Sequence, residues 1–381
     1  MKVLFLGSDP SLFDTESAAH KRMRTYANAI GDLHILSGAR KNICESFFTE
    51  QGTLTLYGIR APKLCLPFLL ARKAHKIIVD HDIEVISAQD PFEHGRAAVS
   101  AARGTFAKVH IQIHTDYLSH WYVHGKIFRG ATVPVPVLNR VRRRIAEQVL
   151  LKADGIRVVS ERIRESLLKK YGTTIPEPSV IPIGVAAITP QPIALPSHQF
   201  TFALLAAGRL EPEKRIEDIL YAIARIVAEY PSLGLFIVGS GSERKKLERM
   251  ATGLGIRDRV IFLGERGQDA PGLMASAQAF IQASAYEGYS RTLVEAALAR
   301  VPIITTDVGI VGEVFKGYEQ VLAAPVGDPA ALATHIAGLI EDVQARKFLV
   351  IEAEKSVRSH LAQFEDVPNL VAADLKSLVS I

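Results

Sequence analysis

The chain has 381 residues, of which 48 % are hydrophobic and 22 % are charged, so its composition is that of a folded globular protein and excludes a disordered chain. Its two cysteines, Cys44 and Cys65, are too few for a disulfide framework, and we expect a reducing, cytoplasmic environment. The net charge of +5 is a mild preference for anionic partners and does not indicate nucleic acid.

The first half of the chain alternates short apolar runs with amphipathic stretches of helical period, which is typical of βα units in a parallel sheet. An apolar strand is expected at residues 3–6, and this run is too short for the core of an export signal. No apolar run approaches the roughly 20 residues that span a bilayer. Further strands are expected at residues 85–88, 109–113, 155–159 and 180–183.

Four prolines between residues 182 and 196 interrupt this alternation, because proline fits neither helix interiors nor central strands. We place a linker at residues 186–199, between a first domain at 1–185 and a second at 200–363. In the second domain, strands are expected at residues 202–206, 235–238, 260–263, 280–283 and 301–305. Both domains are predicted to be doubly wound α/β units, with their chemistry in the loops at the carboxyl ends of the strands.

Two glutamates, Glu287 and Glu295, frame a segment that runs from a glycine-containing loop into a helix. The start of a helix presents unpaired amides and a partial positive charge, which suit phosphate oxygens. The carboxylates can accept hydrogen bonds from a ligand rich in hydroxyl groups. A structural alternative exists for the same residues, with Glu287 as a helix cap and Glu295 as an exposed helix residue.

Two cations, Arg209 and Lys214, lie in the loop between the first strand and the first helix of the second domain. Their side chains can neutralise a diphosphate by direct charge-assisted hydrogen bonds, without a metal. The alternative for this pair is a solvated surface loop.

These segments resemble the retaining glycosyltransferases of family 4. In the second domain the resemblance is carried by Gly-Arg-Leu at residues 208–210 with Lys214, Val-Gly-Ser-Gly at 238–241, Phe-Leu-Gly at 262–264, the two-glutamate segment 287–295, and residues 301–309. In the first domain it is looser, and rests on residues 89–91, 159–160 and 181–184 and on His114. The resemblance implies a GT-B fold, in which two Rossmann-like domains face each other across a cleft.

The resemblance also implies an activity and a set of roles. The expected reaction moves a hexose-type sugar from a UDP- or GDP-sugar to a hydroxyl acceptor, with retention and with neither a metal nor another cofactor. Arg209 and Lys214 would bind the diphosphate and stabilise its developing charge, and Glu287 would hold hydroxyls of the donor sugar. The remaining implied contacts are the amides of Gly288, Tyr289, Ser290, Arg291 and Thr292 to sugar and phosphate, Glu295 to the ribose, Arg266 at the nucleobase, His114 at the donor sugar, and Gly7 at the phosphate.

The sequence departs from the family pattern in two places. The loop that begins at Gly7 lacks the paired glycines of many relatives. Ser290 and Arg291 stand where a glycine and an apolar residue are usual, and we hypothesise that the Arg291 side chain adds a donor or diphosphate contact. The final segment, residues 364–381, is expected to pack as a helix on the first domain, as in relatives.

Two patterns suggest metal sites, and we expect neither to bind a metal. Asp80-His-Asp82 resembles a metal-binding motif of another glycosyltransferase fold, but it lies between a helix and a strand. Three histidines follow or precede His114 within ten residues, but the loop offers only Asp116 as a supporting carboxylate, so zinc is not expected and packing or acceptor contact is.

The segment from Arg140 to Lys170 holds ten basic and four acidic residues, a net charge of 10 − 4 = +6. Its first part has apolar residues at i,i+4 spacing with Arg142 to Arg144 between them, which predicts an amphipathic helix with a positive polar side. One interpretation is a solvated helix face. The other is a contact with anionic lipid at the inner face of the membrane, where each basic residue contributes about 1 kcal/mol.

We therefore predict a glycosyltransferase that takes a nucleotide-sugar donor and a lipid-linked glycan or polysaccharide precursor as acceptor. One alternative is a non-catalytic nucleotide-sugar-binding module, which would bind donor without turnover. Other GT-B enzymes, such as a sugar-nucleotide epimerase or a phosphorylase, are a second alternative. A dinucleotide-dependent dehydrogenase is weaker, because the glycine pattern that starts at Gly239 has Arg244 in place of its third glycine.

Overall fold

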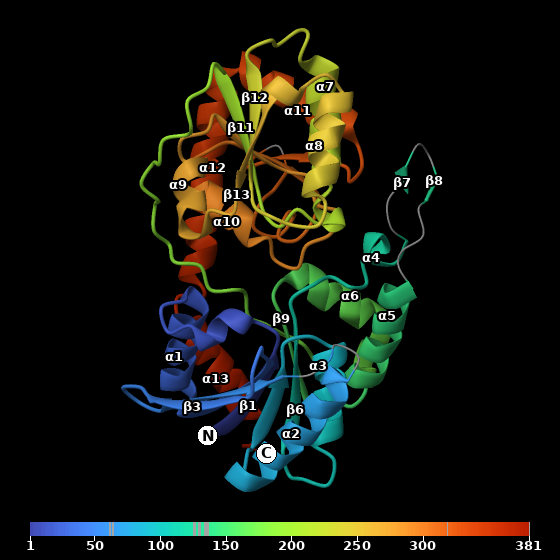
Figure 1. Cartoon of the computed structure of the whole chain (residues 1–381), viewed down its shortest axis with the longest axis vertical. Helices are drawn as coiled ribbons and strands as arrows, with labels where there is room; N and C mark the ends of the chain where they lie inside the picture. Colours follow the sequence, from blue (N-terminus) through green and yellow to red (C-terminus); the bar gives the residue numbers. More distant parts are fainter. Residues whose placement is uncertain are drawn as a thin grey trace. The chain divides into compact units, whose positions relative to one another are not determined.

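The computed structural model describes residues 1–60, 62, 65–124, 127–128, 131–132, 137–317 and 319–380 (Figure 1). The chain forms two compact units. Unit 1 consists of Met1–Leu118, Val135–Gly184 and Asp366–Ile381, and unit 2 of Ser119–Pro134 and Val185–Glu365.

Unit 1 is built on a sheet with the strand order β10-β9-β6-β5-β1-β2-β4-β3, in which every neighbouring pair is parallel except β3 with β4. The central strand β1 is a continuous apolar run, as expected for a strand that is covered on both faces. The strands are β1 (Lys2–Gly7), β2 (Asp32–Gly38), β3 (Ile43–Phe48), β4 (Thr53–Ile59), β5 (Val85–Ala88), β6 (Lys108–Ile113), β9 (Gly155–Val158) and β10 (Ser179–Val180).

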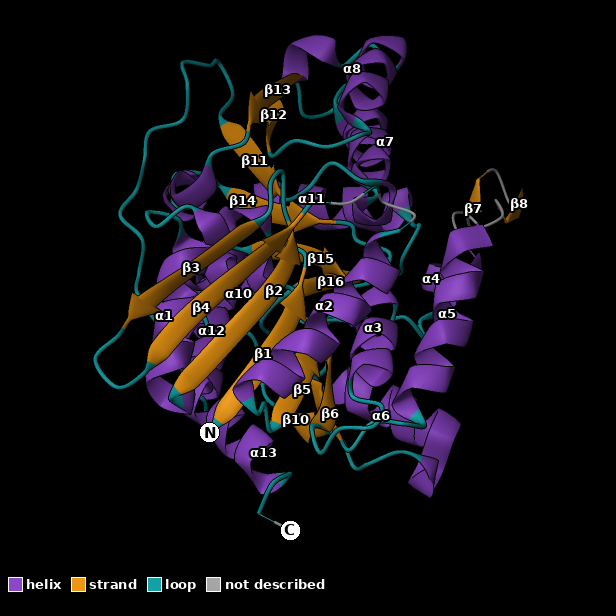
Figure 2. Ribbon diagram, turned by 60° about the horizontal axis from the view of Figure 1, so that its bottom comes forward, coloured by secondary structure: helices purple, strands orange, loops and turns teal. Residues whose placement is uncertain are grey.

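The helices of unit 1 are amphipathic and pack their apolar sides on this sheet. Helix α1 contacts β2 and β4 together with α13, whereas α2 and α3 contact each other and the central strands, as Figure 2 shows. Their bounds are α1 (Ala18–Ile30), α2 (Leu66–His81), α3 (Glu93–Ala101), α5 (Val137–Leu150), α6 (Glu161–Tyr171) and α13 (Val367–Ser377), with short 3-10 turns η1 (Pro10–Phe13) and η2 (Gly172–Thr174).

The last helix, α13, comes from the far end of the chain and belongs to unit 1. Its residues Val371 and Leu375 are fully buried. Its Asp374 accepts hydrogen bonds from His110 Nε2 at 3.1 Å and Ser179 Oγ at 2.6 Å. The C-terminal segment thus completes the core of the unit that the N-terminus begins.

Unit 2 is built on a parallel sheet with the order β13-β12-β11-β14-β15-β16. Its core is apolar and fully buried, with Leu204, Leu235 and Ile281 from the sheet packed on Ile219 and Ile223 of α7. The strands are β11 (Phe202–Ala207), β12 (Leu233–Val238), β13 (Val260–Gly264), β14 (Ala279–Gln282), β15 (Ile303–Thr306) and β16 (Leu322–Ala324). The fold-class prediction of two α/β units with Rossmann-like parallel sheets is confirmed.

The helices of unit 2 follow the strands in βα order. They are α7 (Ile216–Ile226), α8 (Arg244–Gly253), α9 (Ala270–Met274), α10 (Arg291–Leu298), α11 (Pro329–Glu341) and α12 (Val343–Ala362), with 3-10 turns η3 (Pro212–Lys214), η4 (Arg257–Arg259) and η5 (Gly267–Asp269).

The segment Ser119–Pro134 groups with unit 2, whereas the predicted boundary at residue 185 placed it in the first domain. It contains α4 (His120–His124) and the antiparallel pair β7 (Ile127–Phe128) and β8 (Ala131–Thr132). Two ring contacts join this segment to other residues of unit 2. The Trp121 ring lies 5.5 Å from the Arg215 guanidinium, and the Tyr122 ring lies 5.4 Å from that of Tyr286.

Candidate functional site

The loops at the carboxyl ends of β11, β12 and β13 interlock through backbone contacts at glycines. The Gly239 N–H donates to the Gly264 carbonyl at 2.7 Å, and the Gly208 N–H donates to the Val238 carbonyl at 3.0 Å. Gly239 has a φ of +134°, and a Cβ there would lie 1.9 Å from the Gly208 oxygen. Only glycine fits this crossing, which fixes the loop that carries Arg209 and Lys214.

Lys214 and Glu287 are brought together from loops 73 residues apart in sequence. The Lys214 Nζ donates to Glu287 Oε1, which also accepts a hydrogen bond of 2.7 Å from Ser284 Oγ. The two loops are tied by the backbone as well, since the Ala285 N–H donates to the Glu213 carbonyl at 2.8 Å. The side chains are 20 % and 13 % exposed, so the pair is largely desolvated and each charge requires the other or a ligand.

Arg209 lies at the rim of this pair. Its side chain is 75 % exposed, and its Nη2 donates to Glu213 Oε1 at 3.0 Å. An exposed ion pair of this kind is weak, so Arg209 can leave Glu213 and bind an anion that attracts it more strongly. Arg266, which precedes η5, is exposed, and none of the hydrogen bonds found in the described part of the chain joins its side chain to the other predicted site residues.

The segment after Glu287 enters α10 through a left-handed residue, Ser290, whose φ is +69°. Its hydroxyl does not cap α10 but donates to Gln282 Oε1 at 3.0 Å, as the Thr292 hydroxyl does at 2.8 Å. Tyr289 is buried, and its hydroxyl lies 3.0 Å from His360 Nε2. The side chains in this segment therefore hold the backbone, and the first amides of α10 are not capped by Ser290.

Arg291 and Glu295 form an i,i+4 ion pair on α10, with the Arg291 Nε donating to Glu295 Oε1 at 2.7 Å. Glu295 is 14 % exposed, whereas Arg291 is 56 % exposed. The departure from the family pattern at residue 291 thus supplies a cation to the carboxylate that the resemblance assigns to the ribose.

In unit 1, His114 stands at the end of a chain of hydrogen bonds whose polarity can be assigned. Arg157 only donates, so the atom of Gln112 that its Nη1 meets at 3.0 Å is the amide oxygen Oε1. The Gln112 Nε2 then donates to Ser87 Oγ at 2.9 Å. The Ser87 hydroxyl also lies 2.8 Å from His110 Nδ1, and His110 Nε2 donates to the Asp374 carboxylate.

The same logic assigns the tautomer of His114. Its Nε2 lies 3.1 Å from Gln112 Oε1, which can only accept, so Nε2 carries the proton and Nδ1 is the acceptor. Burial, followed by the nearby Arg157 guanidinium, lowers the pKa of His114 to about 3. The His114 ring is therefore uncharged near neutral pH. Its Nδ1 can accept a hydrogen bond, and the ring does not act as a general acid.

An ion pair next to Gly7 was not among the predicted site residues. His94 Nδ1 donates to Asp90 Oδ2, and the Asp90 carboxylate also accepts the Phe92 N–H at 2.8 Å. Burial would lower the pKa of His94, but the hydrogen bond to Asp90 and its charge outweigh burial and raise it. The sequence signal is an aspartate at a strand end followed four residues later by a histidine. Gly7 itself faces Gln89, since a Cβ at Gly7 would lie 2.5 Å from Gln89 Oε1.

The basic segment at residues 140–170 is divided between surface and core. Near the start of α5, Val137 and Val141 are 73 % and 45 % exposed. Arg157, in contrast, is 3 % exposed on β9, so its inclusion in a lipid-contacting surface was wrong. The cause is the parallel register that sets Arg157 beside Gln112. Among the described residues, no helix is long and apolar enough to cross a bilayer.

Comparisons with known proteins agree with this division into two units. The family model described as glycosyl transferases group 1 matches residues 195–356, and that described as glycosyltransferase family 4 matches residues 39–187. Among curated proteins, an uncharacterized glycosyltransferase of Methanocaldococcus jannaschii is 30 % identical over 155 residues, and the N-acetyl-alpha-D-glucosaminyl L-malate synthase of Bacillus anthracis is 32 % identical over 154 residues. Each match covers 40 % of this chain and 40 % of the relative.

Solved structures share the fold of this chain. HepE from Anabaena, in complex with UDP, has a TM-score of 0.69 at 21 % identity, with both chains fully covered. Sucrose-phosphate synthase from Thermosynechococcus elongatus has a TM-score of 0.78 at 18 % identity, covering 100 % of this chain and 99 % of that one. The two family models between them match both parallel-sheet units, and the chain therefore belongs to glycosyltransferase family 4, with the GT-B fold.

Proposed function

We propose that this chain is a retaining, metal-independent glycosyltransferase that transfers a hexose-type sugar from a nucleotide-diphosphate sugar to a hydroxyl acceptor. The observation that carries the proposal is the largely buried Lys214–Glu287 pair, which lies at the carboxyl ends of β11 and β14 beside the start of α10. Cation, carboxylate and helix N-terminus are the groups that a diphosphate joined to a sugar requires.

The residues suggest how the work is divided. Lys214 and Arg209 would bind the diphosphate and stabilise the negative charge that develops on it as the glycosidic bond breaks. In metal-dependent glycosyltransferases a bound metal ion has this role. Glu287 Oε1 is occupied by Lys214 and Ser284, so its Oε2 would accept a hydroxyl of the donor sugar. An ion-paired carboxylate is a poor base, which favours catalysis by leaving-group stabilisation over strong base catalysis.

The uncharged state of His114 is consistent with catalysis by leaving-group stabilisation. A phosphate leaving group needs no protonation, so a histidine near the reacting sugar is more useful as a hydrogen-bond acceptor than as an acid. Structures of HepE with UDP and with UDP-glucose support a uridine nucleotide as the donor to test first. A lipid-linked glycan or polysaccharide precursor is the acceptor class we propose, with the exposed start of α5 as a contact to anionic lipid.

Thermal unfolding with UDP, GDP, ADP and their glucose conjugates, each with and without EDTA, tests the donor site. A nucleotide at 100 times its Kd stabilises the fold by about 2.7 kcal/mol. We expect one base to raise the Tm regardless of EDTA, and Lys214→Ala to abolish the rise. Lys355→Ala, which removes an exposed lysine of α12, is the matched control. No rise with any nucleotide, or a rise that needs metal, would contradict the proposal.

Release of nucleoside diphosphate separates the enzyme from its main alternative. A non-catalytic binding module would show the thermal shift without any release, either to acceptor or to water. We expect slow release from the bound sugar nucleotide in water, because the site stabilises the leaving group even when acceptor is absent.

A further inference from the structure

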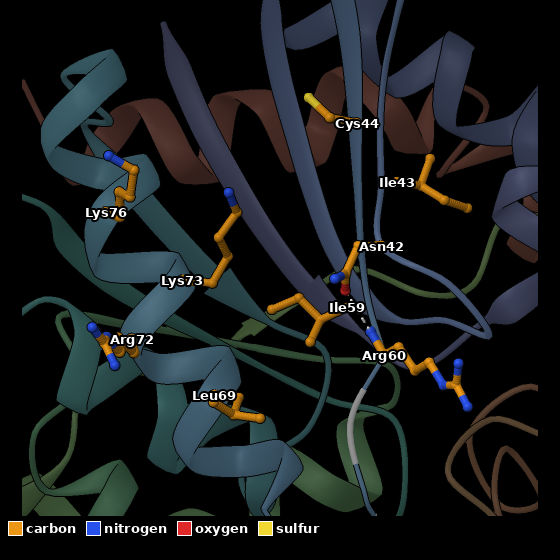
Figure 3. A pocket seen from close by; sticks show the side chains of 10 residues that line it. Asn42, Ile43, Cys44, Ile59, Arg60, Leu69, Arg72, Lys73 and Lys76 are labelled. Atoms are coloured by element: carbon orange, nitrogen blue, oxygen red, sulfur yellow. Dashed lines mark hydrogen bonds between the residues drawn. The ribbon is translucent and has the colours of Figure 1, made fainter.

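Unit 1 contains a groove that none of the predicted site residues lines (Figure 3). It has a volume of about 660 Å³, within the range of small-molecule sites. Helix α2 forms one wall and the β3–β4 hairpin the other. Its lining includes Leu69, Arg72, Lys73 and Lys76 from α2, and Ile59 and Arg60 from the end of β4.

Part of the groove's lining lies at the carboxyl end of β4. Ile59 closes β4, and Arg60 follows it. Strands β1, β2 and β4 run parallel, so the end of β4 shares an edge with Gly7, at the end of β1. Ligands of open α/β sheets bind outside the carboxyl ends of the strands.

The charge of the lining is of one sign. Four cations line the groove and no carboxylate does. Lys76 is paired with Asp80 on its own helix at 3.1 Å, whereas no carboxylate in the described residues pairs with Arg60, Arg72 or Lys73. Lys73 reaches from α2 toward the hairpin, as Figure 3 shows, and its Nζ lies 5.5 Å from the centre of the Tyr57 ring. Clustered like charges are unfavourable until an anion joins them.

The groove also has an apolar component, from Leu69 of α2 and Ile59 of β4. Arginine and lysine side chains together with apolar ones fit a phosphate-type anion that is attached to a less polar body, because guanidinium forks bind phosphate oxygens in pairs. A solvent-exposed helix face that carries only lysines would lack these apolar side chains.

We propose that this groove binds a phosphate-type anionic group of the acceptor, so that the acceptor of this glycosyltransferase is itself an anion. The statement that the bound molecule is the acceptor rests on the proposed function. The statement that a phosphate-type group binds rests on the groove alone. A lipid headgroup and a soluble phosphorylated glycan share this chemistry, and the experiment separates them.

The test compares the parent chain with Arg72→Ala/Lys73→Ala. Both substitutions keep a good helix former on α2, and thermal unfolding checks the fold. The control is Lys21→Ala/Arg103→Ala, which removes one exposed lysine and one exposed arginine elsewhere in unit 1. The probes are inorganic pyrophosphate, measured by titration calorimetry in saturating UDP to occupy the donor site, and vesicles of phosphatidylglycerol or phosphatidylcholine, measured by co-sedimentation.

We expect the parent and control to bind at least one anionic probe, and the groove variant to bind it about tenfold more weakly or worse, the equivalent of one charge-assisted hydrogen bond. Loss confined to phosphatidylglycerol vesicles would assign a lipid headgroup, and loss confined to pyrophosphate a soluble phosphate. Equal binding by all three proteins, or no binding by the parent, would overturn the proposal. The UDP-induced Tm shift should persist in the groove variant. Loss of that shift would concern the proposed donor site, and its outcome is independent of the groove's binding of anions.

Discussion

Replacing Gln112 by glutamate tests the hydrogen-bond polarity that sets the state of His114. In the parent chain, Gln112 Oε1 accepts from both Arg157 and His114, and the ring stays neutral with a pKa of about 3. Gln112→Glu keeps the shape and both accepted hydrogen bonds but adds a negative charge 3.1 Å from the ring nitrogen. The neighbouring donor to Ser87 is lost in the same change.

The size of the effect follows from the charges that face the ring. Burial and the cations Arg157 and Arg22 lower the pKa of His114, and Asp90 opposes them. An adjacent opposite charge raises the pKa of a histidine by about one to three pH units, equivalent to about 1.4 to 4 kcal/mol. Because Arg157 shares the new carboxylate, we expect a rise within that range and not a full return to the ordinary value.

Long-range proton–nitrogen NMR correlation measures both the tautomer and the titration. The spectrum of the parent, assigned by loss of the signal in His114→Gln, should show a proton on Nε2 and no titration of this ring from neutral pH to pH 5. In Gln112→Glu the same ring should begin to titrate, and in the control Gln51→Glu, an exposed glutamine of unit 1, it should not. A parent ring protonated on Nδ1, or a Gln112→Glu ring that never titrates, would show that Gln112 does not set the state of His114 in this way.

Two further predictions concern stability. Gly239→Ala should destabilise unit 2 by about 3 kcal/mol or more in thermal unfolding, because its φ of +134° and the 1.9 Å approach to the Gly208 oxygen exclude a Cβ, whereas Gly253→Ala in α8 meets no neighbour and should be neutral or stabilising. Between pH 7 and pH 5 the unfolded chain protonates His114 and the folded chain does not, so the free energy of unfolding should fall by about 2 kcal/mol on this account, and denaturant titrations of His114→Gln should lack that part of the fall.

The strands that sequence predicted best are those buried on both faces. A continuous apolar run identified β1. The apolar residues of β5 and β6 were sufficient to identify these strands as well, although Ser87 lies in β5 and His110 and Gln112 lie in β6. The pattern missed β2, where His34 and Ser37 are buried polar residues, and β3, which is largely exposed at the margin of the sheet. Burial of a polar side chain depends on its partners, and those come from other strands.

The site shows the same division. The strand-end rule and the family resemblance led to Lys214 and Glu287, and the structure brings them together as an ion pair. The hydrogen-bonded chain that ends at His114 could not be predicted from the sequence. It depends on the register that sets Ser87 beside His110 and Gln112 beside Arg157 in parallel strands. A one-residue slip would turn these side chains to the other face. Register is fixed by the whole sheet and cannot be derived from one strand.

The proposed reaction depends on a metal-independent donor site around Lys214 and Glu287. Calorimetric titration with UDP-glucose and GDP-sugars in EDTA, followed by detection of nucleoside diphosphate release, tests it most directly. We predict saturable binding of one donor by the parent and by Lys355→Ala, no measurable binding by Lys214→Ala, and release of the diphosphate from the bound donor. Equal binding by Lys214→Ala, or binding that appears only when a divalent metal is restored, would contradict the claim.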